Sequence, residues 1–228
     1  MKQSLYASTE QLNQQFSQRI VALLEEGIAS KGRASLLVSG GRTPLGLFAA
    51  LSTSELDWSK VDISLADERW VDASDDASNE KMVTENLLQN NAAKANFVSL
   101  KTNQTDAADA VREISSRLDS MSKPFDVLIL GMGEDGHTAS LFPCSAQIAE
   151  GLDMDSNQQV IAVTPGTAPH QRMSLTLPAL LTSQNIFLHL TGDSKMQVLQ
   201  QALDGDDELA MPIRAVLNRA DVELIWAA

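Results

Sequence analysis

Apolar positions recur along the chain in two patterns, which predict helices that alternate with strands. From Ser8 to about Ser30 they follow the three- and four-residue spacing of a helix, which Gly32 then ends. Short apolar runs predict strands at Ala34–Ser39, Val61–Ala66, Asn96–Leu100, Phe125–Leu130, Gln159–Val163, Arg172–Leu177, Asn185–Leu190 and Val222–Trp226. Further helices are expected after Thr43 (as N-cap, with Pro44 first in the helix), and at Glu80–Gln89, Thr105–Met121, Ser194–Leu203 and Ile213–Asn218.

This order of elements predicts an α/β fold with a mostly parallel, Rossmann-like doubly wound sheet and helices on both faces. The chain has no internal repeat, low-complexity tract or linker, so residues 1–228 are expected to form a single domain. In such sheets, ligands bind beyond the carboxyl ends of the strands. Candidate chemistry is therefore sought in the loops that follow strands.

Charge narrows the choice of partners. The chain has 17 Lys and Arg against 30 Asp and Glu, a formal net charge of −13. This charge argues against a nucleic-acid partner, and an anionic ligand would need the few basic residues gathered at its site. The longest apolar runs, such as Val127–Leu130, are too short for a membrane span, and the N-terminus lacks the apolar core of a secretory signal. The single cysteine, Cys144, excludes an internal disulfide and suits a reducing compartment, so a cytoplasmic location is expected.

Two of the candidate loops follow the first two predicted strands. The first holds Ser39, Gly40, Gly41, Arg42 and Thr43, where two glycines and a helix start can cradle a phosphate, although an ordinary tight turn would have the same residues. The second is Asp67-Glu68-Arg69. Three charged residues directly after a buried strand are costly unless they face a polar cleft, and Arg69 could hold a carboxylate or a developing oxyanion there. A structural ion-pair cluster is the alternative.

The third loop contains Gly131, Gly133 and Gly136 in the spacing of a dinucleotide fingerprint. That interpretation is rejected, because the glycines lie in mid-chain and no clear strand ends in an acidic residue about twenty positions later. We interpret the loop as presenting Asp135 and His137, whose imidazole can take a proton near neutral pH, unless the histidine is merely structural. His170 and His189 form no ligand spacing with His137, so no metal or other cofactor is expected.

The last loop places Lys195 in the first turn of a helix, where a basic residue is more favourable with an anion bound opposite it. A solvated surface lysine is the alternative. Arg172 begins its own strand and could face the cleft only from a segment that reaches over it. Arg42, Arg69 and Lys195 all fall at predicted strand-to-helix junctions.

Together these segments resemble the 6-phosphogluconolactonase family, which shares its fold with glucosamine-6-phosphate deaminases/isomerases. The matching segments, in the family's order and over nearly the whole chain, are Ser39–Pro44, Asp67–Arg69 with Ser78-Asn79, Gly131–Pro143, Arg172–Leu177 and Gly192–Lys195. The run Asp-Gly-His-Thr-Ala-Ser-Leu-Phe-Pro is the specific one. Deaminases have a Phe-Asn-Glu-Pro type segment after the histidine and typically a tyrosine after Asp-Glu, whereas this chain has Leu141-Phe142-Pro143 and Arg69.

The resemblance implies hydrolysis of a small-molecule substrate, 6-phosphogluconolactone, in the oxidative pentose phosphate pathway. His137 would be the general base, Asp135 its orienting partner and Arg69 the stabiliser of the oxyanion. Lys195 and the loop of Ser39, Gly40, Gly41, Arg42 and Thr43 would hold the 6-phosphate, with Arg172 as a further candidate. Asp67 would be structural or would orient the substrate. An amino-sugar-phosphate deaminase/isomerase and a non-catalytic sugar-phosphate sensor of the same fold stay open as alternatives, and the oligomeric state is not predicted.

Overall fold

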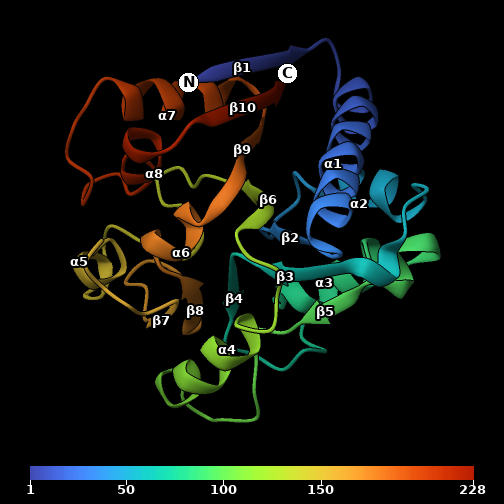
Figure 1. The fold of residues 1–228 in the computed structure, drawn as a ribbon. Helices are drawn as coiled ribbons and strands as arrows, with labels where there is room; N and C mark the ends of the chain where they lie inside the picture. The colour runs from blue at the N-terminus through green and yellow to red at the C-terminus, as the bar shows by residue number, and fades with distance from the viewer.

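The computed structural model describes residues 1–228 and contains a seven-stranded sheet in which every strand runs parallel to its neighbours (Figure 1). The strand order is β1-β10-β9-β6-β2-β3-β5. The strands are β1 (Lys2–Tyr6), β2 (Ala34–Val38), β3 (Val61–Leu65), β5 (Asn96–Val98), β6 (Phe125–Leu130), β9 (Ser183–Thr191) and β10 (Val222–Ala227). The predicted mostly parallel doubly wound sheet is confirmed.

Helices cover both faces of this sheet. In Figure 1, α1 and α2 lie on one side, and α6, α7 and α8 lie on the other. The helices are α1 (Thr9–Lys31), α2 (Leu45–Ser52), α3 (Asn79–Asn86), α4 (Val111–Leu118), α5 (Ile148–Gly151), α6 (Leu177–Leu181), α7 (Asp193–Leu203) and α8 (Ile213–Arg219), with short 3₁₀ turns at Trp58–Lys60, Asn90–Lys94 and Ala108–Ala110. None of them combines the length and the hydropathy that a membrane span requires.

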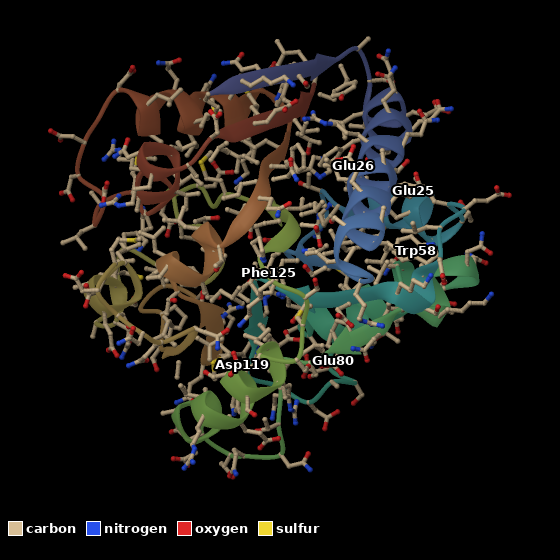
Figure 2. All side chains as sticks on the ribbon, viewed as in Figure 1. Glu25, Glu26, Trp58, Glu80, Asp119 and Phe125 are labelled. Atoms are coloured by element: carbon tan, nitrogen blue, oxygen red, sulfur yellow. The ribbon has the colours of Figure 1, made fainter.

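Helix α1 shows how closely local sequence determines an element here. The Ser8 side chain accepts a hydrogen bond from the Gln11 amide, and Gly32 ends the helix in the left-handed region. Leu12, Phe16, Ile20 and Leu24 face the sheet, whereas Glu25 and Glu26 lie exposed on the outer side (Figure 2). The expected start and end of this helix are confirmed.

The interior of the molecule is one cluster of 58 buried apolar residues. Strands β2, β3 and β6 are buried at every position, because they lie in the centre of the sheet with helices on both sides. Trp58 and Phe125, both labelled in Figure 2, belong to this cluster. Burial on both faces explains why these strands have continuous apolar runs rather than alternating ones.

A second, smaller sheet stands apart from the parallel one. It joins β4 (Asp67–Arg69), β8 (Arg172–Leu175) and β7 (Val160–Val163) in antiparallel order β4-β8-β7. The predicted strands at 159–163 and 172–177 therefore exist, but they pair with each other and with a segment expected to be loop. This sheet brings Arg172 to the same side of the molecule as the loops that follow β2 and β3.

Two local predictions were wrong, and one edge strand was missed. Helix α2 begins at Leu45 with Pro44 as its N-cap, and the Thr43 side chain caps nothing, because the Gly40-Gly41 turn extends further than a direct strand-to-helix turn. The helix expected at 105–121 is shorter, with a 3₁₀ turn at 108–110 before α4. Strand β1 was not predicted, because an edge strand with exposed Lys2 and Gln3 lacks the apolar signal of the central strands.

Candidate active site

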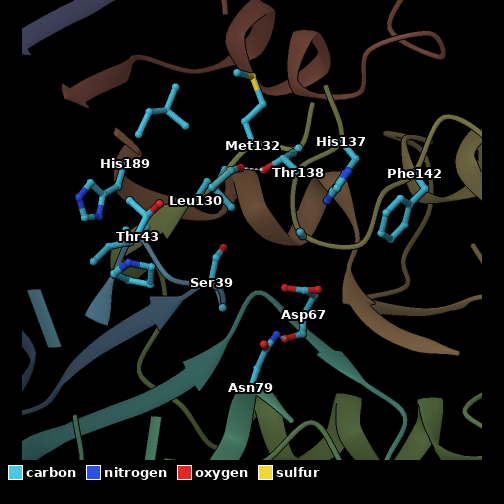
Figure 3. A pocket seen from close by; sticks show the side chains of 18 of the residues that line it. Ser39, Thr43, Asp67, Asn79, Leu130, Met132, His137, Thr138, Phe142 and His189 are labelled. Atoms are coloured by element: carbon cyan, nitrogen blue, oxygen red, sulfur yellow. Dashed lines mark hydrogen bonds between the residues drawn. The ribbon is translucent and has the colours of Figure 1, made fainter. Parts of the chain in front are cut away.

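A cavity of about 360 Å³ opens at the carboxyl ends of β2, β6 and β9 (Figure 3). It lies at the topological switch point of the sheet, where the strand order reverses between β2 and β6. This is the place where ligands bind in doubly wound sheets. Of the predicted site residues, the cavity is lined by Ser39, Gly40, Gly41, Thr43, Asp67, Arg69, His137, Arg172 and Lys195. Arg42 is exposed and lies outside the lining, and Asp135 stands behind His137.

His137 is held by Asp135 through a contact of 2.5 Å between the imidazole Nδ1 and the carboxylate Oδ1. The same oxygen accepts the His137 backbone amide at 3.1 Å. The hydrogen bond with His137 lowers the pKa of Asp135, so the carboxylate stays charged. The carboxylate accepts a hydrogen bond from the Nδ1–H group of the imidazole. Nε2 is therefore the ring nitrogen that can take a proton from a bound group.

Steric constraints require glycine at two positions of the loop before His137. The Gly133 amide donates to the His137 carbonyl at 2.8 Å, and a Cβ at position 133 would overlap the imidazole Nδ1. Gly136 has a φ of +75°, in the left-handed region that glycine adopts without strain. These glycines allow the histidine ring to lie against its own loop, so a dinucleotide is not needed to account for them.

Arg69 and Arg172 form a pair of cations at the cavity wall. They are direct partners across the antiparallel strands β4 and β8. Arg69 donates through Nη1 to the Ala77 carbonyl at 2.6 Å and Arg172 through Nη2 to the Pro169 carbonyl at 3.1 Å, but both Nε atoms are buried without a partner. Burial, and then the charge of Arg69, lower the pKa of Arg172. Free donors on two adjacent guanidiniums favour an anion between them.

The two carboxylates that precede Arg69 have different roles. Asp67 lines the cavity and accepts a hydrogen bond from the Ser140 hydroxyl at 2.5 Å. Glu68 instead accepts the amides of Asn79 and Glu80, at 2.8 and 2.7 Å, at the start of α3. Burial raises the pKa of Glu68 in spite of these bonds. The charged triplet is thus partly a helix cap and partly a cavity wall.

The loop after β2 forms another part of the cavity wall. Ser39 has a buried hydroxyl without a hydrogen-bond partner, and Gly41 adopts a φ of +102°. The hydroxyl groups of Thr43 and Thr191 are 3.4 Å apart. A Cβ at Gly40 would overlap the Asn79 carboxamide, so the glycine is required by this close approach. Free polar groups around a turn that only glycine can make suit recognition of a phosphate or of sugar hydroxyls.

Lys195 lies in the first turn of α7 and forms an ion pair with Glu134, with 2.7 Å between Nζ and Oε1. The sequence led us to expect an anion opposite this lysine, and the Glu134 carboxylate is such an anion. The glutamate is mostly exposed, so a dianionic ligand can compete with it for the ammonium group.

The sequence and the structure were compared with those of known proteins. The family described as glucosamine-6-phosphate isomerases/6-phosphogluconolactonase matches residues 7–226. The chain belongs to this family. It is 41% identical to a 6-phosphogluconolactonase of Rhizobium meliloti, over 98% of this chain and 97% of that one. The crystal structure of a 6-phosphogluconolactonase from Shewanella baltica superposes with a TM-score of 0.97 at 46% identity, covering 100% of this chain and 98% of that one.

A monomeric glucosamine-6-phosphate deaminase also shares the fold, with a TM-score of 0.82 at 20% identity over 100% of this chain and 97% of that one. Identity at that level shows the fold alone. The predicted family and fold class are therefore confirmed, and the choice between the branches depends on the more similar relatives.

Sequence reasoning missed several residues that line the cavity in this family member, notably Asn79, Phe142 and His189. Asn79 is buried and donates to the Asp67 carbonyl at 2.9 Å, and it was noted only as part of a motif. Phe142 was noted only as part of a motif, and His189 only as a histidine without ligand spacing to His137. Figure 3 shows Phe142 on the His137 side of the cavity and His189 beside Thr43. Their contribution depends on contacts between distant segments, which no local pattern reveals.

Proposed function

We propose that this chain hydrolyses 6-phospho-D-glucono-1,5-lactone to 6-phosphogluconate, with His137 as the general base that activates water. Curated relatives named 6-phosphogluconolactonase match nearly the full chain at about 40% identity, and they confirm the predicted class of enzyme, a lactone hydrolase of the pentose phosphate pathway. The observation that carries the histidine proposal is the Asp135–His137 pair in a cavity with three cationic side chains.

The mechanism needs only groups that line this cavity and Asp135, which lies behind His137. Water attacks the lactone carbonyl carbon while its proton passes to Nε2 of His137, and Asp135 stabilises the resulting imidazolium. The carbonyl oxygen becomes an oxyanion, for which Arg69 offers a buried free donor. When the tetrahedral intermediate collapses, the bond from the carbonyl carbon to the ring oxygen breaks, and His137 returns its proton to that oxygen. The product is the open-chain acid.

The 6-phosphate requires cations and amide donors away from the carbonyl. We assign Lys195, Arg172 and the Ser39–Thr43 loop to it, because they line the same cavity. Ser39 and Arg172 also keep buried side-chain donors without a partner. Arg42 is omitted from this assignment, since its side chain is exposed and outside the lining. Asp67 is held by Ser140 and is assigned to substrate orientation. The proposal includes a cytoplasmic location, as a single cysteine suits a reducing compartment.

The decisive experiment is pH-stat hydrolysis of freshly made 6-phosphogluconolactone, corrected for its spontaneous decay. Acid release above the spontaneous rate is expected with the wild-type chain and close to the spontaneous rate with His137→Ala. Release of ammonia from glucosamine 6-phosphate, without lactone hydrolysis, would instead identify the deaminase branch. Binding of sugar phosphate without turnover of either substrate would identify a sensor.

A further inference from the structure

The Phe142 ring contacts the proposed base and lies within cation–π range of one of the proposed anion-binding cations. Its ring centroid is 4.2 Å from that of His137, with 32° between the ring planes. On the cation side, the guanidinium carbon of Arg172 is 5.8 Å from the same centroid. Phe142 is buried, and Figure 3 shows its ring near that of His137. One aromatic ring is therefore close both to an imidazole that must become cationic and to an arginine that is already cationic.

The backbone is bent to achieve this contact. Leu141 donates to the Thr138 carbonyl at 3.0 Å, which closes a tight turn directly after His137. The Thr138 hydroxyl anchors the turn on the Gly131 carbonyl at 2.9 Å. Ala139 in this turn has a φ of 49°, a left-handed conformation that is strained for a residue with a Cβ. The strained turn carries the chain back, so that residue 142 packs against residue 137.

The charges around His137 explain why such a ring is useful. The Asp135 carboxylate stabilises an imidazolium from one side. Arg69, Arg172 and Lys195 line the same cavity and oppose a further positive charge, while Asp67 favours it. The face of an aromatic ring carries negative potential, so it attracts a cation placed against it. Phe142 can thus attract both the imidazolium and the guanidinium.

We propose that Phe142 is a positioning residue for His137, which fixes the imidazole against Asp135 and favours its cationic form during hydrolysis. This inference rests on the proposed role of His137 as the base. The Phe142 side chain itself exchanges no proton and forms no bond with the substrate.

The test compares Phe142→Leu and Phe142→Tyr with Phe125→Leu. Phe125 is a matched control, because it is buried at the start of β6 and has a lysine ammonium 5.8 Å from its ring, away from the cavity. Phe142→Leu is expected to lower kcat roughly 10- to 100-fold with KM changed little, since the base loses its fixed orientation. Phe142→Tyr should keep most of the rate, and Phe125→Leu should lose stability but keep kcat.

Fluorination provides a second test that leaves the fold intact. Phenylalanines with increasing numbers of ring fluorines, incorporated at position 142, keep the shape of the ring but weaken the negative potential of its face. The acid limb of the kcat–pH profile should then move stepwise to lower pH, by about 0.5 unit in all. A merely structural phenylalanine would leave the limb in place.

The outcomes separate this inference from the function on which it rests. A well-folded His137→Ala protein with normal turnover would end the base assignment and this inference together. An inactive His137→Ala protein beside a Phe142→Leu protein with normal kcat per folded molecule, or a fluorinated series with an unmoved acid limb, would overturn the role of Phe142 alone.

Discussion

Arg69 and Arg172 lie directly opposite each other on antiparallel strands, and neither has a carboxylate partner. Like charges in this position destabilise a sheet, and burial makes the repulsion harder to screen. The lowered pKa of Arg172 reflects that burial and the charge of its partner. Anionic groups of the substrate, bound at the two guanidiniums, would offset the repulsion. We therefore expect the protein without bound substrate to be less stable than a variant that has a neutral side chain in place of Arg172.

Arg172→Met should accordingly raise stability while it weakens binding. The expected gain in the ligand-free protein is up to about 1 kcal/mol, a rise in Tm of roughly 2–4 °C. KM for the phosphorylated lactone should rise roughly 10- to 100-fold, because a charge-assisted contact worth about 1.5–3 kcal/mol is lost. Calorimetry and steady-state kinetics on one preparation test both. Exposed Arg112 on α4 offers a control, Arg112→Met, and an unchanged KM in Arg172→Met would contradict the assignment.

His137→Ala should lower kcat by roughly 10²–10⁴-fold, the usual contribution of a general base. His137→Asn should be nearly as slow, since an amide can hold water but cannot accept its proton. Both proteins should stay folded, because the His137 side chain is 28% exposed and its loop is held by backbone hydrogen bonds. Thermal unfolding measured beside kcat checks this, and a folded alanine variant with near-normal turnover would refute the mechanism.

Lys195→Ala should act on binding and should depend on the phosphate. Loss of a charge-assisted contact is expected to cost about 1.5–3 kcal/mol with 6-phosphogluconolactone and little with the unphosphorylated lactone. Glu134→Gln is the matched control, as it removes the partner of Lys195 but keeps the ammonium group. Its KM should stay equal or fall. The assignment of Lys195 to the phosphate would be wrong if Lys195→Ala lost equal efficiency on both substrates.

His189 predicts an acid sensitivity of folding. Burial lowers its pKa to about 4, and neither ring nitrogen has a hydrogen-bond partner. The unfolded chain takes up a proton near pH 6.5 but the folded protein does not, so stability falls as pH drops from about 6.5 to about 4, by roughly 3 kcal/mol. His189→Leu should remove most of this dependence. Urea unfolding at pH 7.5 and pH 4.5 measures the loss of stability in each protein. An equal loss in wild type and His189→Leu would exclude His189 as the cause of the pH dependence.

Glu223 predicts a stabilisation that disappears only in strong acid. Arg19, Ser4 and Lys2 bind its carboxylate, and the hydrogen bond from Arg19 chiefly lowers its pKa to about 2. The stabilising effect is complete above the ordinary pKa near 4.5 and is lost as pH falls towards 2. Glu223→Gln should therefore destabilise the protein by about 1–3 kcal/mol at pH 7 and by less at pH 3. A difference that stays constant between those pH values would contradict this account.

How much of the molecule the sequence could predict depends on the range of the contacts involved. Phe125–Leu130 and the helix from Ser8 to Gly32 have local signals, namely a continuous apolar run and helical spacing with caps, and both were found where expected. Strand β4 has three charged residues, and only pairing with β8, about a hundred positions away, makes it a strand. The proximity of Arg69 to Arg172 is likewise long-range. The proximity of Phe142 to His137 depends on the strained turn at Ala139.

The last strand also determines where a fusion can be attached. The Trp226 indole donates to the Gly192 carbonyl at 3.1 Å, and the Gly192 amide donates to the Ala227 carbonyl at 2.9 Å. Residue 228 therefore emerges beside the start of α7, close to Lys195 and the mouth of the cavity. Because β1 runs parallel to β10, residue 1 emerges at the opposite end of the strands, at their amino ends. An affinity tag or fluorophore for binding assays therefore belongs on the amino end, where it leaves the approach of the substrate open.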